Sequence, residues 1–228
     1  MPREMLDRQI QMLKDEILLL GSMVEQATLD AVKALKGRDL QEARRIYEAD
    51  EDINQKHFDI ENKCIGVIAT QQPIMATDLR LLASILEVNT ELERMGDYAK
   101  GIARICILLG GQPPLKPLID VPRMAEIAVN MLHRALSAFV NHDKEQALAI
   151  PKEDDEVDDL YNQVYRELVT YMISDPSTID RANYLMWVTH NLERLADRVT
   201  NICERTLYIS TGIIRELDRS DDEYDQSS

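Results

Sequence analysis

Long runs of apolar residues, spaced alternately three and four positions apart, constrain the fold of this 228-residue chain more than any other feature. The first run begins at Leu6, continues through Ile10 and Leu13, and ends near Ala34. Residues at this spacing share one face of an α-helix, so the run predicts a long amphipathic helix with a coiled-coil-like seam. Five further runs follow, and turn-forming residues separate them. The sequence therefore predicts an all-α chain with six long helices.

The second half of the chain repeats the pattern of the first half. The apolar seam of the third predicted helix recurs 100 residues later in the sixth, and that of the second helix recurs 104 residues later in the fifth. The expected fifth helix follows Asp143 and continues without interruption to Tyr171. Asp39 with Glu42, and Asp143 with Gln146, are predicted to form capping boxes at matching helix starts. Because short connections make successive helices antiparallel, the predicted fold is two tandem antiparallel three-helix bundles related by an internal repeat.

Proline and charge define the expected domain boundaries. The first bundle is predicted to span residues 3–111, and the second 120–216. A proline-rich linker at 112–119 joins them, and residues 217–228 form an acidic, disordered tail.

The charge balance excludes several classes of function. A formal net charge of −15 disfavours binding to nucleic acid and to anionic lipid surfaces. Three cysteines without C-x-x-C spacing are typical of small buried side chains in a reducing compartment. No apolar run approaches the length of a membrane span, and the first residues lack the apolar core of a signal peptide. These features predict a cytoplasmic protein.

Acidic residues interrupt the apolar seams at matching places in the two halves. Asp50 and Asp154 occupy core-facing positions, and a polar residue follows each of them one helical turn later. The segments LERMGD and LERLAD each carry a glutamate and an aspartate four residues apart. The resulting set of candidate residues is Asp50, Asn54, Glu93 and Asp97 in the first half, and Asp154, Asp158, Glu193 and Asp197 in the second.

Antiparallel packing predicts that each half gathers its polar residues at one level. If the chain folds back near Pro73, Asp50 lies level with Asp97, and Asn54 with Glu93. The same folding near Pro176 places Asp154 level with Asp197, and Asp158 with Glu193.

Too few lysines or arginines are expected on these faces to balance several packed carboxylates, whereas a multivalent cation would balance them. Oxygen ligands favour a hard metal such as Fe, Mn, Mg or Ca. The alternative is a polar, water-filled groove with raised carboxylate pKa values and no ion.

Several of these segments resemble signature motifs of the PhoU family. They are LERMGD and LERLAD, the acidic DEDIN and DDEVD, and the PIMATDLR segment that starts at Pro73. The resemblance extends from about residue 3 to residue 216. It implies a cytoplasmic protein, often dimeric, that restrains phosphate uptake and phosphate-starvation signalling. Its implied partners are the ATPase subunit of the phosphate ABC transporter and a phosphate-sensing histidine kinase.

The resemblance also implies multinuclear iron or zinc clusters on the acidic surfaces. The implied metal ligands are Glu93, Asp97, Glu193 and Asp197, with Asp50, Asp154 and Asp158 as co-ligands. Asn54 departs from the all-acid pattern, which predicts weaker metal binding in the first half. Arg94 and Arg194, which follow the motif glutamates, either hold a carboxylate behind the metal ligands, contact a partner protein, or form exposed ion pairs.

Three classes of function remain compatible with the sequence. They are a regulatory adaptor with bound metal, a carboxylate-ligated metalloenzyme, and a helical adaptor without metal. The chain lacks a glycine-rich phosphate loop, a nucleophile motif and a general base distinct from the ligands. His133, His142 and His190 lack the Glu-x-x-His pairing of di-iron oxidases. These observations favour a regulatory protein rather than an enzyme.

Overall fold

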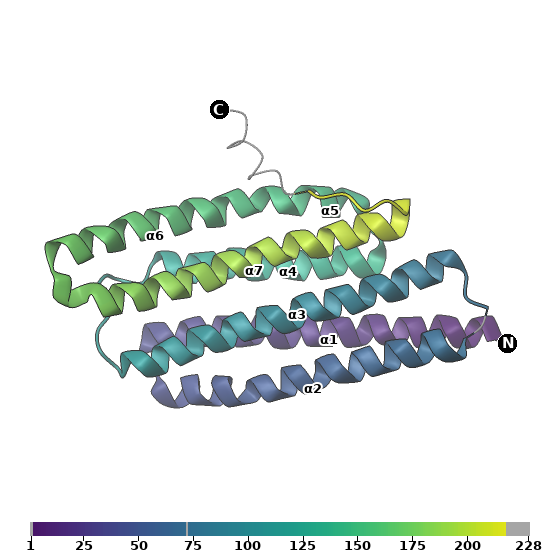
Figure 1. Cartoon of the computed structure of the whole chain (residues 1–228), viewed down its shortest axis with the longest axis horizontal. Helices are drawn as coiled ribbons and strands as arrows, with labels where there is room; N and C mark the ends of the chain where they lie inside the picture. The colour runs from purple at the N-terminus through teal and green to yellow at the C-terminus, as the bar shows by residue number, and fades with distance from the viewer. Residues whose placement is uncertain (1, 72, 218–228) are drawn as a thin grey trace.

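The computed structural model describes residues 2–71 and 73–217 of the chain. Within these ranges the regular structure is entirely helical, with no strand (Figure 1). The helices form two elongated bundles that lie side by side, and the chain completes the first bundle before it enters the second. The predicted all-α fold with two repeated bundles is therefore confirmed. The expected acidic tail lies outside the described residues from position 218 onward.

The first bundle consists of three long helices: α1 (Pro2–Gly37), α2 (Leu40–Thr70) and α3 (Ala76–Leu109). Their apolar seams are buried against one another, and Ile17, Ile60 and Leu92 are completely inaccessible to solvent. Gly110 follows the last residue of α3 and caps the helix in a left-handed conformation with φ of 61°. Glycine takes this conformation without the steric cost that a Cβ atom imposes.

The second bundle follows the same path with more interruptions. Its elements are α4 (Asp120–Asn141), α5 (Lys144–Ala149), the 3₁₀ segment η1 (Ile150–Glu153), α6 (Asp154–Ser174), the 3₁₀ segment η2 (Pro176–Thr178) and α7 (Ile179–Thr211). Together α5, η1 and α6 form the counterpart of α2, and α7 is the counterpart of α3.

The prediction of a continuous fifth helix is wrong at residues 150–153. There the chain tightens into η1 before it continues as α6. Pro151 provides the physical reason, because its ring carries no N–H to continue the α-helical hydrogen bonds. The backbone stays in the right-handed helical region on both sides, at Ile150 and Asp154. Asp154 is therefore the first residue of α6, so the acidic motif DDEVD lies at the N-terminus of that helix.

The two capping boxes are formed only in part. The side chain of Asp39 accepts hydrogen bonds from the N–H groups of Gln41 and Glu42, as an N-cap does. The N–H of Asp39 donates instead to the carbonyl of Ala34 at 2.9 Å, in the preceding helix. Since this N–H is already satisfied, Glu42 does not complete the box, and its carboxylate accepts from Arg45. The predicted caps are present, whereas the predicted reciprocal bond at this site is not.

Asp143 caps α5 in the same way, through the N–H groups of Glu145 and Gln146. We expect Asp143→Ala to lower the free energy of unfolding by about 1 kcal/mol, because two helix-terminal donors lose their acceptor. Glu145→Ala is the matched control, since Glu145 is an exposed acid in the same turn whose backbone N–H, and not its side chain, takes part in the cap; its effect is expected to stay within about 0.5 kcal/mol. Urea denaturation followed by circular dichroism measures both. Equal effects of the two substitutions would contradict the capping role.

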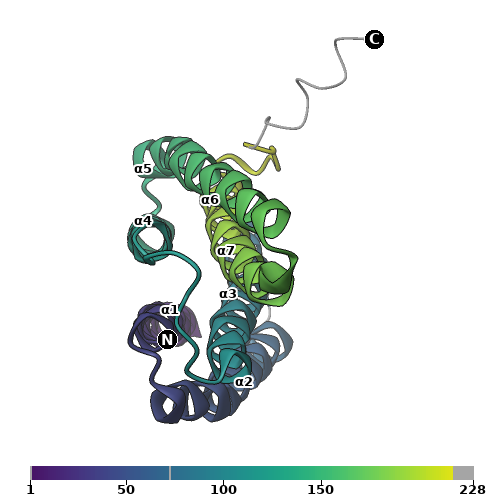
Figure 2. The ribbon, with the colours of Figure 1, turned by 90° about the vertical axis from the view of Figure 1, so that its left-hand side faces the viewer.

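The bundles pack through α3 against α7 and through α1 against α4. Figure 2 shows α1 and α4 forming one side of the molecule, and α3 and α7 the other. Arg198 of α7 donates to Glu91 of α3 at 2.8 Å and to the hydroxyl of Tyr98 at 3.0 Å. On the opposite side Gly21 allows α1 to approach α4, because a Cβ atom there would lie 2.1 Å from Leu136 Cδ1. The two bundles thus share one continuous core.

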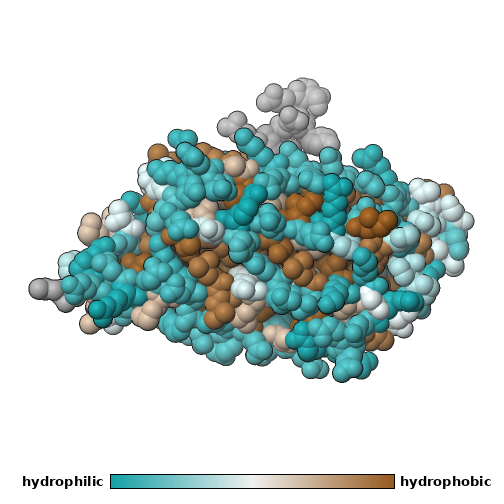
Figure 3. Space-filling model, turned by 180° about the vertical axis from the view of Figure 1, so that it is seen from behind, coloured by the Kyte–Doolittle hydropathy of each residue, from teal (hydrophilic) through white to brown (hydrophobic). Residues whose placement is uncertain are grey.

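The face behind α3 and α7 carries apolar side chains along its middle, surrounded by hydrophilic ones (Figure 3). Met5, Met12 and Leu19 are among the exposed apolar residues of α1. Over the described residues, no helix is both long enough and apolar enough to cross a membrane.

Candidate metal centres

The second bundle gathers three aspartates from two helices. Asp154 opens α6, Asp158 lies one turn later, and Asp197 comes from the facing helix α7. One carboxylate oxygen of each lies within 4.8 Å of the other two, and all three side chains are partly buried. This spacing allows one cation to contact all three residues. We call Asp154, Asp158, Glu193 and Asp197 the second acidic cluster.

Glu193 lies one turn before Asp197 on α7 and completes this cluster. Its side chain is 21% exposed. Burial, followed by the negative charges of Asp197 and Asp158, raises the pKa of the Glu193 carboxyl to about 7. The charges concentrated here are therefore costly at neutral pH in the absence of a counter-ion.

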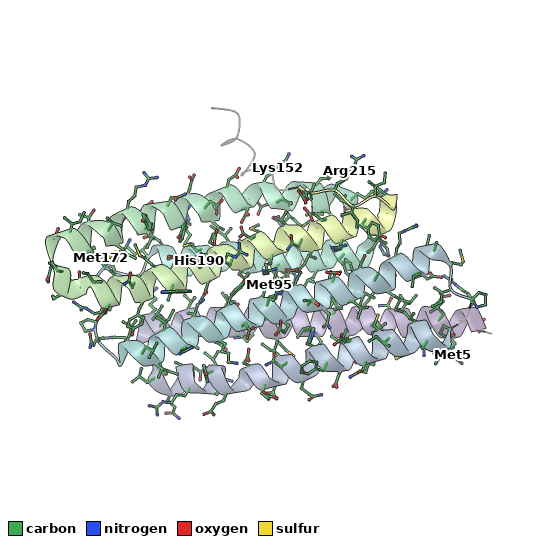
Figure 4. All side chains as sticks on the ribbon, viewed as in Figure 1. Met5, Met95, Lys152, Met172, His190 and Arg215 are labelled. Carbon is green, nitrogen blue, oxygen red and sulfur yellow. The ribbon has the colours of Figure 1, made fainter. Side chains whose placement is uncertain are left out.

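Two basic side chains border the second acidic cluster. Arg194 Nη1 lies 3.1 Å from Asp197 Oδ2. His190 Nδ1 lies 3.2 Å from Glu193 Oε2, a distance that permits an ion pair once the imidazole is protonated. Figure 4 shows His190 near the middle of α7. Arg194 thus pairs with a cluster carboxylate, and because its side chain is 42% exposed the contact fits both the carboxylate-holding role and the exposed ion pair that the sequence left open.

The first bundle buries one carboxylate much more deeply. Asp50 of α2 is only 3% exposed. Its Oδ2 accepts hydrogen bonds from Lys100 Nζ at 2.6 Å and from Asn54 Nδ2 at 3.2 Å. Its other oxygen, Oδ1, is buried without a hydrogen-bond partner among the described residues. An unsatisfied buried oxygen of this kind is costly and is uncommon in native proteins.

Glu93 and Asp97 lie beside Asp50 on the facing helix α3. Burial, followed by the charge of Asp97, raises the pKa of Glu93. The pKa of Asp97 is also raised, first by the partial burial of its carboxyl group and then by the charge of Asp50. The residue as a whole is nevertheless exposed. The structure therefore brings Asp50, Glu93 and Asp97 into one electrostatic group. We call these three residues and Asn54 the first acidic cluster.

Lys100 is the residue that the sequence argument missed. The expectation that too few cationic side chains share these faces did not include Lys100, which crosses from α3 to Asp50 on α2 and balances one of the three carboxylates of the first acidic cluster. The hydrogen bond to Asp50 contributes to raising the pKa of the Lys100 ammonium. Lys100 Nζ also lies 5.4 Å from the centre of the Tyr47 ring. The antiparallel register that pairs Asp50 with Asp97 pairs Tyr47 with Lys100 as well, so it was the signal that could have revealed this contact.

A groove of about 350 Å³ opens beside the first acidic cluster, between α1, α2 and α3. Asp50 and Lys100 line it together with apolar residues, which include Leu19 and Met23 of α1. The second acidic cluster has the denser set of carboxylates. Carboxylate oxygens are ligands for hard cations, and the three aspartates fit such an ion.

Fold and site together define a class of protein: an all-helical tandem repeat in which each bundle carries acidic residues between its second and third long helices. Comparison with known proteins agrees with this description. The model of the PhoU domain matches residues 17–106 and 121–206, one match in each bundle. The chain therefore belongs to the PhoU family, as its motifs indicate.

Relatives cover nearly the whole chain. The "Phosphate-specific transport system accessory protein PhoU homolog" of Clostridium acetobutylicum is 35% identical over 97% of this chain and 100% of its own length. The corresponding Escherichia coli protein is 34% identical over 90% of this chain and 84% of its own.

Two crystal structures share the fold. PhoU from Pseudomonas aeruginosa has a TM-score of 0.85 and 35% identity, and covers 91% of this chain and 99% of that chain. The phosphate transport system regulatory protein PhoU from Streptococcus pneumoniae has a TM-score of 0.85 and 30% identity, and covers 92% of this chain and 99% of that chain. These relatives are accessory or regulatory proteins of phosphate transport, the class of protein that the sequence favours.

Proposed function

We propose that this protein regulates phosphate uptake and phosphate-starvation signalling from the cytoplasmic side of the membrane. The observation that carries the proposal is the match of both bundles to phosphate-specific transport accessory proteins, at about one third identity over about nine tenths of the chain or more. The protein acts as an adaptor between the ATPase subunit of a phosphate ABC transporter and a phosphate-sensing histidine kinase. In this role it keeps the phosphate regulon off while phosphate is sufficient.

The shape and charge of the molecule support an adaptor role. Two elongated bundles present long helical faces, and the net charge of −15 favours basic surfaces on protein partners. A homodimer would present each of these faces twice.

The acidic clusters are the proposed metal sites. Asp154, Asp158 and Asp197, with Glu193 beside them, would hold an iron or zinc ion, or a cluster of such ions, between α6 and α7. The corresponding residues of the first bundle are Asp50, Asn54, Glu93 and Asp97. A bound cation supplies positive charge that balances the packed carboxylates. The side chains hold the ion and, through it, fix one helix of the bundle against the next.

The adaptor function is tested by deleting the gene in its native host and restoring it on a plasmid. With phosphate in excess, we expect the deletion to derepress a phosphate-regulon reporter and the plasmid to restore repression. Tagged protein is expected to co-purify with the transporter ATPase and the histidine kinase. Normal repression in the deletion strain, together with failure to capture either partner at both high and low phosphate, would refute the proposal.

Elemental analysis tests the metal sites. Protein purified from a native-like cytoplasm is expected to carry about one or more iron or zinc atoms per chain, because several carboxylates converge within ligand distance. The variant E93A/D97A/E193A/D197A is expected to lose that metal while it keeps its helical circular dichroism spectrum. Wild-type protein without metal would leave the acidic clusters as surfaces for partners and would refute their role as metal sites.

A further inference from the structure

The two acidic clusters differ in composition, although the internal repeat relates their positions one to one. The second cluster has a carboxylate at all four positions, whereas the first has an amide, Asn54, where the second has Asp158. The first cluster therefore offers a cation one carboxylate fewer. On composition alone, the first cluster is expected to bind a cation more weakly than the second cluster.

A positively charged group already occupies the first acidic cluster. Lys100 Nζ lies 2.6 Å from Asp50 Oδ2, and Tyr47 lies beneath the ammonium. In the repeat, Lys100 corresponds to Thr200 and Tyr47 corresponds to Pro151. The second cluster therefore has neither an ammonium at this position nor the aromatic ring beside it.

The arginine beside the second cluster is placed differently from Lys100. Arg194 pairs with Asp197 on its own helix, three residues away, and its side chain is 42% exposed. An arginine at the rim can exchange its partner for water at low cost. Lys100 instead crosses between helices to a carboxylate that is 3% exposed, so its departure would leave a buried charge without a counter-ion.

A divalent ion that entered the first cluster would meet this obstacle directly. It would have to displace Lys100 from Asp50, or bind next to an ammonium that repels it. We propose, building on the metal sites of the proposed function, that Lys100 is the built-in cation of the first acidic cluster and that divalent metal binds each chain at the second cluster. Lys100 then adds a permanent ionic link between α2 and α3, whereas the corresponding ionic link between α6 and α7 forms only when metal is bound. The second bundle is therefore the half of the molecule whose stability responds to the metal supply.

Titration with Mn²⁺ tests the asymmetry, since electron paramagnetic resonance distinguishes free from bound Mn²⁺. Asp97→Asn and Asp197→Asn remove the same carboxylate from the two clusters. We expect D197N to weaken the tight binding by more than about tenfold and D97N to change it by less than about twofold. Equal losses in the two variants, or a loss in D97N alone, would overturn the inference.

Exchange of repeat-equivalent residues gives the second test. K100T/N54D installs in the first cluster the residues that occupy the second, and N54D alone adds the carboxylate while it keeps Lys100. We expect a new class of tight Mn²⁺ sites in K100T/N54D and none in N54D. A new class of tight Mn²⁺ sites in N54D would refute the role of Lys100 as the built-in cation. The absence of such sites in a folded K100T/N54D would refute it as well.

Circular dichroism checks that each variant is folded. If K100T/N54D does not fold, the comparison of D97N with D197N still decides the question. The outcomes also separate this inference from the metal sites on which it rests. Absence of Mn²⁺ binding in every protein would refute those sites, whereas equal binding at both clusters would refute the asymmetry alone.

Discussion

Replacement of Lys100 by methionine is expected to lower the free energy of unfolding by about 2–4 kcal/mol, one of the two largest effects that we predict for a single side chain. Methionine keeps the length of the side chain and removes the charge. Asp50 would then remain buried with only the amide of Asn54 as a hydrogen-bond donor. Removal of one partner from a fully buried ion pair costs about 3–5 kcal/mol, and we expect less here because the Lys100 side chain is 31% exposed.

The double variant D50N/K100M provides the control. It removes both charges, so it is expected to recover most of the stability that K100M loses. Urea denaturation of wild-type protein, both single variants and the double variant forms a double-mutant cycle that measures the coupling between Asp50 and Lys100. Additive effects would show that the two groups do not interact, contrary to the 2.6 Å contact.

Glu193→Gln is expected to stabilise the protein at alkaline pH when metal is removed by a chelator. The folded state raises the pKa of Glu193 from its ordinary 4.5 to about 7, so between these pH values it holds a proton that the unfolded chain releases. The contribution of this group to stability is therefore complete below pH 4.5 and is lost as the pH rises through 7. Glutamine carries no charge, so at pH 8 we expect E193Q to be more stable than wild type by about 1–3 kcal/mol.

The measurement is the free energy of unfolding as a function of pH. Wild-type protein is expected to lose stability between pH 5 and 8, and E193Q is expected to lose less. E93Q, the same substitution at the repeat-equivalent position, is the matched control, and we expect a smaller effect because the charges of His57 and Arg94 both oppose the rise in the pKa of Glu93. An unchanged pH dependence in E193Q would show that the second cluster does not hold Glu193 in its protonated form.

Much of this architecture was predictable because the signals for it are local in the sequence. Apolar spacing determines which residues face the core of a helix, and glycine or proline marks where helices end. Antiparallel register follows from short turns, so the expected proximity of Asp154 to Asp197 required no tertiary information. The same reasoning failed at η1, where the effect of Pro151 on the backbone outweighed a seam that continues through Ile150 and Val157.

The contacts between bundles carry no such signal. Arg198 directly follows the motif segment LERLAD, yet it pairs with Glu91 of the other bundle rather than with a residue of the second acidic cluster. Periodicity shows that a position is half buried but does not show which distant helix covers it. The packing of α3 against α7 therefore emerged only from the folded structure.

The sequence by itself determined the helices, their duplication, the family and the eight candidate ligands, because helical period and turn chemistry act over a few residues. The tertiary structure decided which of those carboxylates are already balanced. Lys100 is charged and polar in the sequence, and nothing local distinguishes it from a solvated surface lysine. The antiparallel register places Lys100 level with Tyr47, but the ion pair with Asp50 also depends on three-dimensional distance and burial, which only the packing of α2 against α3 decides.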